Sequence, residues 1–219
     1  MGILYGIGVG PGDPMLMTLK AVEAIKKCDI IAIPSRKSVA YEIAVGAVPE
    51  IEEKPKLYLD MPMIKDVDLI KKKHLEVANI IIENLDKNIG FLTLGDPSIY
   101  STFSYINDIV SKDYETVVIP GITSFSGAAA LSNEALVQWD ESLYVIPSIH
   151  DDSLVLRRGT NVFMKSGKSL SELREKLASV EYKSIKIIEK CGMEEEKVYE
   201  DFDSLPEKLS YFTLVVIKV

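Results

Sequence analysis

The feature that most constrains the fold is a run of glycines near the amino terminus, between an apolar stretch and a helical pattern. Residues 3–5 are apolar, residues 6–14 read GIGVGPGDP, and apolar side chains then recur at helical spacing. Glycine permits positive φ and lets a ligand approach the backbone, because it has no Cβ. A strand, a glycine turn and a helix in this order are typical of small-molecule sites at the edge of a parallel sheet. We expect such a site here, with Asp13 as a helix N-cap and Pro14 in the first helical position.

Two common nucleotide-binding loops do not match this turn. The phosphate-binding pattern G-x-x-x-x-G-K-[ST] does not occur in the sequence. The dinucleotide fingerprint G-x-G-x-x-G is one residue longer than the stretch from Gly8 to Gly12, and the next apolar run, residues 29–33, ends without a carboxylate to hold a ribose. The turn therefore suits a ligand that contacts the backbone and places no pyrophosphate on a helix.

Composition and charge narrow the class of protein. The 219 residues carry a formal net charge of −8, which argues against broad nucleic-acid binding and would repel an anionic substrate at long range. No apolar run approaches the roughly 20 residues of a membrane span, and the amino terminus lacks the pattern of a signal peptide. Two cysteines, Cys28 and Cys191, fit a reducing cytoplasm. The sequence has no C-x-x-C or H-x-x-x-H pattern, so we expect no metal site.

Apolar runs alternate with helical patterns along the chain, which indicates α/β architecture. The predicted strands cover residues 3–9, 29–33, 57–59, 90–94, 116–119, 143–146, 161–164, 184–188 and 212–217, with a short arm at 198–199, and the predicted helices cover residues 15–27, 39–48, 66–86, 101–112, 125–131 and 170–178. On the first helix, Leu16, Leu19, Val22 and Ile25 form the expected buried face. We place a domain boundary near Asp113, which gives α/β domains at residues 1–113 and 114–219.

Three of the loops that follow predicted strands carry glycine, proline and acidic or hydroxyl residues. They read GVGPGD at residues 8–13, GDP at residues 95–97 and PGITS at residues 120–124. In this order and spacing they resemble the tetrapyrrole (corrin/porphyrin) methylase family, which shows G-x-G-x-G-D, then G-D-P, then P-G-[IV]-[TS] before a small-residue helix. The resemblance covers essentially the whole chain. The run from Gly95 to Tyr105 is most similar to the C(20)-methyltransferases that act on precorrin-2 or cobalt-factor II.

This resemblance implies a fold, a cofactor and an assembly. It implies two α/β domains with a ligand cleft between them, in a homodimer. From the cysteine usage, the acidic charge and the apolar runs, we expect this homodimer to be cytoplasmic, with neither nucleic acid nor a membrane as partner. It implies S-adenosyl-L-methionine (SAM) as cofactor, S-adenosyl-L-homocysteine as product and a tetrapyrrole as methyl acceptor. The implied activity is methylation of carbon 20 of cobalt-factor II or precorrin-2, and the presence of cobalt in the acceptor stays open.

The resemblance also assigns residues to the site. The implied cofactor contacts are Gly10, Pro11, Leu94, Gly95, Asp96, Ile99, Thr123, Ser124, Lys165, Gly192 and Thr213. The expected substrate contacts are Tyr100, Arg157 and Arg158, since a precorrin carries many carboxylates and arginine binds a carboxylate with two hydrogen bonds. Arg36, Lys37 and Lys168 are further candidates. No catalytic residue is assigned, because the proton that leaves the methylated carbon could go to Asp96, Glu189, Tyr100 or water.

Two other functions remain open at this point. One is methylation of another acceptor by a relative in the same family, such as uroporphyrinogen III, a later precorrin, rRNA ribose or the diphthamide precursor; the acidic charge disfavours rRNA. The other is a module that binds SAM or a nucleotide without catalysis.

Overall fold

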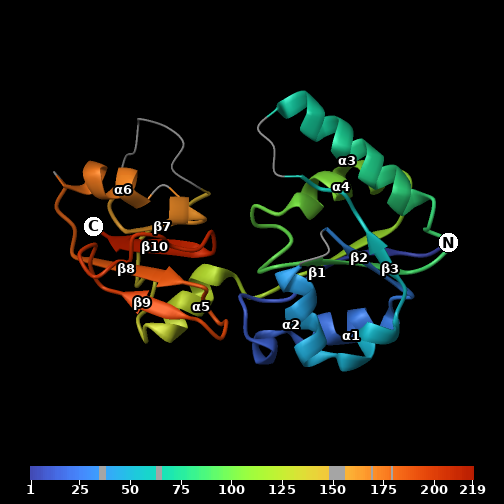
Figure 1. Cartoon of the computed structure of the whole chain (residues 1–219), viewed down its shortest axis with the longest axis horizontal. Coiled ribbons are helices and arrows are strands. Elements are labelled where there is room, and N and C mark those ends of the chain that lie inside the picture. The colour runs from blue at the N-terminus through green and yellow to red at the C-terminus, as the bar shows by residue number, and fades with distance from the viewer. Residues whose placement is uncertain (35–37, 63–65, 148–155, 169, 179) are drawn as a thin grey trace. The chain divides into compact units, whose positions relative to one another are not determined.

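The computed structural model describes residues 1–219 except 35–37, 63–65, 148–155, 169 and 179 (Figure 1). The chain divides into two compact units, Met1–Thr123 and Ser124–Val219. The boundary therefore lies later than the one predicted near Asp113. The reason is that strand β5 (Thr116–Ile119) pairs in parallel with β1 (Leu4–Gly8) and so belongs to the first sheet.

The first unit contains a five-stranded parallel sheet. Its strands are β1, β2 (Ile30–Ile33), β3 (Lys56–Tyr58), β4 (Ile89–Thr93) and β5, in the spatial order β3-β2-β4-β1-β5. β1 lies between β4 and β5, with Gly8 opposite Thr93 and Ile7 opposite Ile119. The loops that follow these three strands therefore begin side by side at one edge of the sheet.

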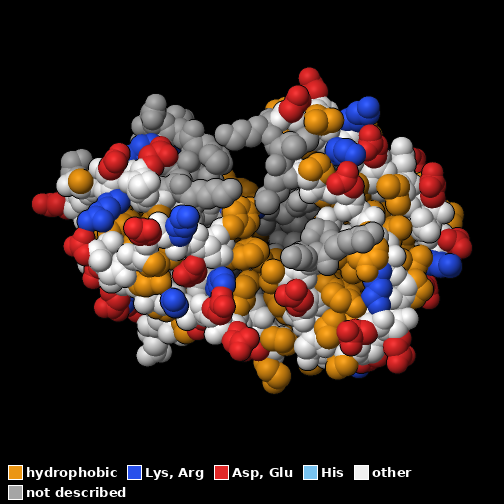
Figure 2. Space-filling view, in the orientation of Figure 1, with side chains coloured by type: hydrophobic (Ala, Val, Ile, Leu, Met, Phe, Trp, Pro, Cys, Tyr) orange, Lys and Arg blue, Asp and Glu red, His pale blue; other side chains and the backbone are white. Residues whose placement is uncertain are grey.

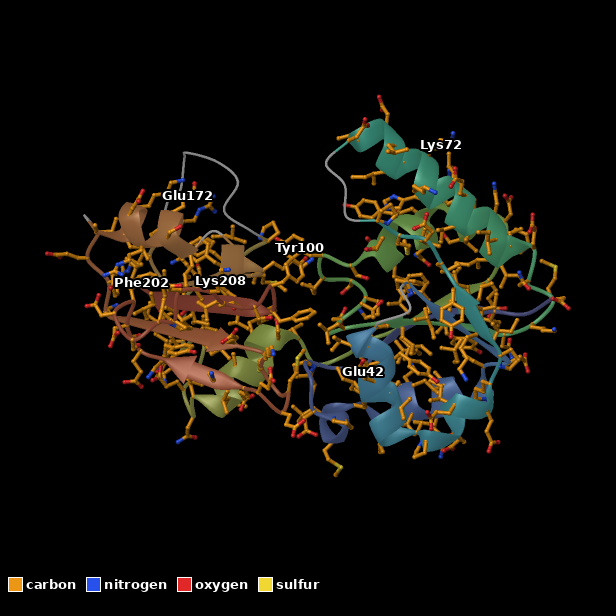
Figure 3. All side chains as sticks on the ribbon, in the orientation of Figure 1. Glu42, Lys72, Tyr100, Glu172, Phe202 and Lys208 are labelled. Carbon is orange, nitrogen blue, oxygen red and sulfur yellow. The ribbon has the colours of Figure 1, made fainter. Side chains whose placement is uncertain are left out.

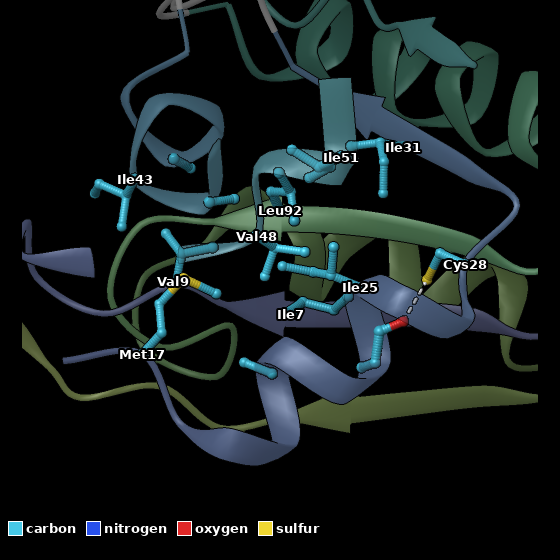
Figure 4. Close-up of a cluster of buried hydrophobic side chains, with 14 of the residues drawn as sticks. Ile7, Val9, Met17, Ile25, Cys28, Ile31, Ile43, Val48, Ile51 and Leu92 are labelled. Carbon is cyan, nitrogen blue, oxygen red and sulfur yellow. Dashed lines mark hydrogen bonds between the residues drawn. The ribbon is translucent and has the colours of Figure 1, made fainter. Parts of the chain in front are cut away.

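Helices cover both faces of this sheet, as Figure 1 shows. One face packs against α1 (Leu19–Lys27) and α2 (Val39–Ala47), and the other packs against α3 (Val67–Ile82) and α4 (Thr102–Val110). Figure 4 shows the first of these cores, where Ile7, Ile25 and Leu92 pack together and the Cys28 thiol donates to the carbonyl oxygen of Ala24 (3.1 Å). Strands buried on both faces explain the nearly continuous apolar runs in this half of the sequence.

The start of the first helix differs from the prediction. Asp13 does cap a helical turn, because its carboxylate accepts from the Met15 amide (2.8 Å), but this turn is the short 3₁₀ helix η1 (Pro14–Leu16). The α-helix begins only at Leu19, after a second cap in which Thr18 accepts from the Ala21 amide (3.1 Å). Leu19 is consequently 86% exposed, contrary to the prediction, whereas Ile25 is buried as predicted and Leu16 and Val22 are half-buried. Ala21 and Ala24 complete the buried face of α1.

The second unit contains a mixed five-stranded sheet in the order β6-β7-β10-β8-β9. Its strands are β6 (Leu143–Ile146), β7 (Thr160–Phe163), β8 (Ser184–Glu189), β9 (Lys197–Tyr199) and β10 (Thr213–Lys218). β10 runs antiparallel to both β7 and β8, while β6 runs parallel to β7. The carboxyl ends of β6, β7 and β8 therefore share one edge with the amino end of β10.

Two helices cover this second sheet on opposite faces (Figure 1). Helix α6 (Leu170–Leu177) packs with Phe163 and Val215 on one face, and α5 (Ser124–Leu131) contributes Ala128 to the core on the other. Two further 3₁₀ turns, η2 (Pro49–Glu53) and η3 (Ser166–Lys168), complete the described elements. Each strand and helix predicted from the sequence has a counterpart, so the predicted α/β fold class is confirmed.

The surface is mixed in charge. On the face of each unit that Figure 2 shows, acidic and basic side chains are interspersed. Among the helices that the structure describes, none is long and apolar enough to cross a membrane.

Candidate functional site: the glycine edge of the first sheet

Three loops meet at the carboxyl edge of the first sheet. The Gly10 amide donates to the Gly95 carbonyl (3.3 Å), and the Gly95 amide donates to the Gly10 carbonyl (2.8 Å). A Cβ placed on Gly121 would lie 2.1 Å from the Gly95 oxygen and 2.9 Å from Cα of Gly8. The three loops chosen from the sequence are thus in backbone contact, and side chains at Gly8 or Gly121 would push them apart. We call this cluster, residues 8–13, 94–100 and 120–123, the glycine edge.

Gly95 is buried, but its backbone leaves room for a ligand on the side where a side chain would project. Gly10 and Gly95 have φ values of +81° and +73°, a region that L side chains rarely adopt. A Cβ on Gly95 would meet no atom of the described residues within 4 Å. The space beside Gly95 is therefore open, which fits a small molecule that contacts the backbone of this loop.

Asp96 links two of the three loops. One carboxylate oxygen accepts from the Gly121 amide (3.1 Å), and the other accepts from the Ser98 amide (2.7 Å) and the Ser98 hydroxyl. A carboxylate has about four lone-pair sites, so one acceptor position remains for a donor on a ligand. Asp96 therefore holds the glycine edge together and keeps limited capacity for a ligand ammonium or hydroxyl.

The remaining predicted residues of these loops differ in exposure. Pro11 is buried, Leu94 and Ile99 are half-buried, and Tyr100 is 46% exposed. Tyr100 has a φ of +47°, which is uncommon for a residue with a side chain. Its side chain extends from the loop between β4 and α4 (Figure 3). A strained residue that follows the G-D-P turn is consistent with a contact to a ligand, because such strain concentrates at binding sites.

Thr123 and Ser124 lie where one unit ends and the next begins. Thr123 is the last residue of the first unit, and Ser124 is the first residue of α5. Both are half-buried.

Three predicted cofactor contacts lie together at one edge of the second sheet. Lys165 follows β7, Gly192 follows β8, and Thr213 begins β10 opposite Glu189. Lys165 and Gly192 have φ values of +57° and +75°. Thr213 is buried and its hydroxyl donates to the Ser210 carbonyl (2.7 Å), so its side chain has a role within the unit.

Two potential proton acceptors and the nearby thiol are constrained by their neighbours. Glu189 accepts from the Ser210 amide (2.6 Å). Asp96 is engaged as described above. Burial raises the pKa of the Cys191 thiol to about 11, with a smaller contribution from the charge of Glu196. Cys191 is therefore protonated at neutral pH and is not a nucleophile there.

The two arginines predicted to bind substrate lie at the other end of β7. Arg157 and Arg158 precede β7, whereas Lys165 follows it. The backbone of Arg157 is fixed by Asn161, whose side-chain oxygen accepts from the Arg157 amide (3.1 Å), and its guanidinium lies 5.0 Å from the ring centroid of Tyr144. The structure thus does not bring this pair together with Lys165, Gly192 and Thr213. Arg36, Lys37 and the side chain of Lys168 lie outside the described residues.

Sequence reasoning missed two residues of the glycine edge. The PGITS pattern at residues 120–124 predicts no particular role for Gly121, and the resemblance assigns none to Ser98. A serine two positions after an aspartate is a common Asx-turn partner, so the D-P-S order was a usable signal for Ser98. Nothing in the sequence showed that Gly121 and Gly95 touch. Within the described part of the chain, no group of His, Cys, Asp and Glu side chains is arranged to hold a metal ion.

The fold and the glycine edge define the class of this protein: a chain of two α/β units with a candidate small-molecule site on glycine loops at the end of a parallel sheet. The sequence profile of the tetrapyrrole (corrin/porphyrin) methylases matches residues 3–204. The chain belongs to this family.

Similar proteins agree with this assignment. The chain is 33% identical to a probable cobalt-precorrin-2 C(20)-methyltransferase of Methanocaldococcus jannaschii, over 98% of this chain and 95% of the relative. It is 28% identical to a precorrin-2 C(20)-methyltransferase of Sinorhizobium sp, over 99% and 95%. A crystal structure of uroporphyrin-III C-methyltransferase from Thermus thermophilus, complexed with S-adenosyl homocysteine, superimposes with a TM-score of 0.70 at 17% identity, over 99% and 92%.

Proposed function

We propose that this protein is a SAM-dependent C-methyltransferase of cobalamin biosynthesis that methylates carbon 20 of precorrin-2 or cobalt-factor II. The observation that carries the proposal is the convergence of three glycine loops in a chain whose relatives over nearly the full length are named as C(20)-methyltransferases. The cofactor is SAM, which supplies a methyl group already activated by its sulfonium centre.

The residues of the glycine edge fit this cofactor. The open space beside Gly95 gives a ligand access to the backbone, and the remaining acceptor position of Asp96 suits an ammonium or a ribose hydroxyl. Pro11, Leu94 and Ile99 supply apolar surface around this position, with Gly10 fixing the turn. Thr123, Ser124, Lys165, Gly192 and Thr213 stay predicted contacts.

Methyl transfer from SAM depends little on general acid or base catalysis. Transfer of an activated methyl to an electron-rich ring carbon is a direct displacement, so the main contribution of the chain is to align the acceptor carbon with the methyl group. Rigid loops serve this purpose, and the link from Asp96 to Gly121 and Ser98 makes the glycine edge rigid. Tyr100, exposed on the same loop, is the proposed contact for the tetrapyrrole.

The proposal includes an assembly and a location. We infer a homodimer in the cytoplasm, supported by the family membership and by two unpaired thiols, Cys28 and Cys191.

Two experiments test the activity against its alternatives. Isothermal titration with SAM separates a SAM-binding protein from one that does not bind it. Turnover with SAM carrying a ¹³C-methyl group and a panel of precorrin-2, cobalt-factor II and uroporphyrinogen III then separates a C(20)-methyltransferase from another tetrapyrrole methylase and from a non-catalytic module. We expect labelled product from precorrin-2 or cobalt-factor II, with the label on carbon 20 by NMR. Label on another carbon, or binding without transfer, would contradict the proposal.

A further inference from the structure

The connection between α5 and β6 presents a fully exposed tryptophan. Every residue from Asn133 to Ser142 except Leu136 is exposed. Trp139 is 103% exposed at a φ of +53°, and Val137 beside it is 37% exposed. A fully exposed tryptophan is a candidate for the centre of an interaction surface, because tryptophan is enriched among the residues that dominate binding energy.

The backbone that carries Trp139 is held in place by the second sheet. The Thr160 hydroxyl of β7 donates to the Leu136 carbonyl, and the Lys218 ammonium of β10 donates to the Ala135 carbonyl (2.7 Å). A local turn adds two bonds between Gln138 and Glu141, from the Glu141 amide to the Gln138 carbonyl (3.0 Å) and from the Gln138 amide to the Glu141 carboxylate (2.9 Å). Because the segment is already ordered, a partner that covers Trp139 loses little free energy in fixing it.

Charges of both signs lie close to this segment. Asp140 and Glu141 follow Trp139 directly, and Ser142 accepts a hydrogen bond from the Thr160 amide (2.9 Å) at the start of β7. A Cβ on Gly159 would lie 2.4 Å from the Ser142 carbonyl oxygen, so Arg158 lies at the same end of the sheet as Glu141. Among the residues that the structure describes, no ion pair joins Arg157 or Arg158 to a carboxylate of the same chain.

We propose that Val137, Trp139, Asp140, Glu141, Arg157 and Arg158, here called the Trp139 surface, bind the same surface of a second copy of this chain. A two-fold interface requires one patch that complements itself. The Trp139 surface meets this requirement, since its basic pair can face Asp140 and Glu141 of the second copy while the two tryptophans pack near the axis. Tryptophan and arginine are also the residues most often found at the energetic centre of interfaces.

Size and net charge agree with this arrangement. A stable interface buries about 800 Å² on each partner, and a tryptophan supplies at most about 250 Å² of that. The Trp139 surface is therefore the centre of the interface and not its full extent. At a net charge of −8 each, two copies repel at long range, so association depends on the short-range apolar contact and on the arginine–carboxylate pairs.

The first test measures mass in solution without substrate, so it does not depend on the methyltransferase activity. This inference rests on the proposed homodimer, and light scattering of the wild type should give twice 24.3 kDa, or 48.6 kDa. Trp139→Glu should raise the dimer dissociation constant about thirtyfold or more while leaving the circular dichroism unchanged. Leu19→Glu, which changes another highly exposed apolar residue (86%) in the first unit, should leave the dissociation constant unchanged. A monomeric wild type would overturn both the homodimer and the surface, whereas a dimer that survives Trp139→Glu would overturn the surface alone.

The second test uses the symmetry of the pairing. Arg158→Glu places two acidic groups together at both contacts of the dimer, and Asp140→Arg places two basic groups together, so each variant alone should dimerise less tightly. Mixing them creates one native pair and one reversed pair, and native mass spectrometry should then detect the mixed dimer in excess of either homodimer. If mixing yields no mixed dimer, as expected of an Arg158 that serves only substrate, the pairing is refuted.

Discussion

The two sheets arrange the ends of their strands differently. In the first sheet every strand runs in the same direction, so Gly10, Gly95 and Gly121 meet at one edge although they are far apart in sequence. In the second sheet β10 runs antiparallel to β7 and β8, so its amino end lies beside the carboxyl ends of those two strands, whereas the residues that precede β7 lie at the other edge. Lys165 is consequently grouped with Gly192 and Thr213, while Arg157 and Arg158 are not. In a parallel sheet all loops that follow strands lie at the same edge, so the sequence order of the motifs is enough to predict that they meet. In a mixed sheet the direction of each strand must also be known.

The largest effect is expected from a methyl group at the contact between loops. Gly121→Ala would bring a Cβ within 2.1 Å of the Gly95 oxygen and displace the loop beside the open space. We expect a loss of about 1 to 3 kcal/mol in the free energy of unfolding and about a hundredfold rise in the dissociation constant for SAM, measured by isothermal titration.

The opposite edge of the same sheet offers a matched control for Gly121. A Cβ on Gly2 would lie 2.0 Å from the Lys87 carbonyl oxygen, so Gly2→Ala should destabilise the protein to a similar degree. It should leave SAM affinity unchanged in the folded fraction. Equal loss of affinity in both variants would mean that stability, and not the glycine edge, determines binding.

A smaller effect is expected at the carboxylate that joins the loops. Asp96→Asn replaces one acceptor of the Gly121 amide or of Ser98 by an NH₂ group. Hydrogen bonds to charged groups contribute about 1.5 to 3 kcal/mol, so SAM affinity should fall roughly ten- to a hundredfold. Asp13→Asn is the control, because asparagine and aspartate cap helical turns equally well and Asp13 caps only η1. Equal SAM affinity in the Asp96 and Asp13 variants would show that Asp96 does not contribute to cofactor binding.

The two buried thiols predict how stability depends on pH. Burial raises the pKa of Cys28 from 9.0 to about 12, partly opposed by the charge of Lys54, and raises that of Cys191 to about 11. The unfolded thiols ionise above pH 9 while the folded ones stay protonated, so folding stability falls as pH rises from 9 toward 11 and 12. At pH 10 each thiol should lower the free energy of unfolding by about 1.4 kcal/mol relative to its value well below pH 9, where the thiol is protonated in both the folded and the unfolded state.

Urea denaturation at pH 8 and pH 10 measures this pH effect in each unit. Cys28→Ala should weaken the pH dependence of the first unit, and Cys191→Ala should weaken that of the second. The comparison uses the change with pH, because either substitution also lowers stability by leaving a small cavity. A wild-type stability that is equal at both pH values would show that the thiols are not held protonated.

Much of the fold and part of the site followed from the sequence alone. Apolar runs that alternate with helical patterns predicted the strands and helices, and Gly8, Gly95 and Pro120 marked three loops that the parallel sheet brings together. The position of Leu19 could not be predicted, because whether Asp13 or Thr18 caps the α-helix depends on the intervening 3₁₀ turn. The grouping of Thr213 with Lys165 and Gly192 also could not be predicted, since the direction of β10 relative to β7 and β8 is set by long-range pairing. The separation of Arg157 from Lys165 did follow from the sequence, because the two residues flank one predicted strand.

One measurement tests the central claim, that SAM occupies the open space beside Gly95. In Gly95→Ala the new methyl group meets no described protein atom, so the variant should fold with a loss of only about 1 to 2 kcal/mol from the positive φ. Isothermal titration with SAM at a temperature where wild type and variant are both folded should show at least about a tenfold loss of affinity, since the methyl group then projects into the ligand. Unchanged affinity in the folded variant would place the cofactor elsewhere and contradict the account.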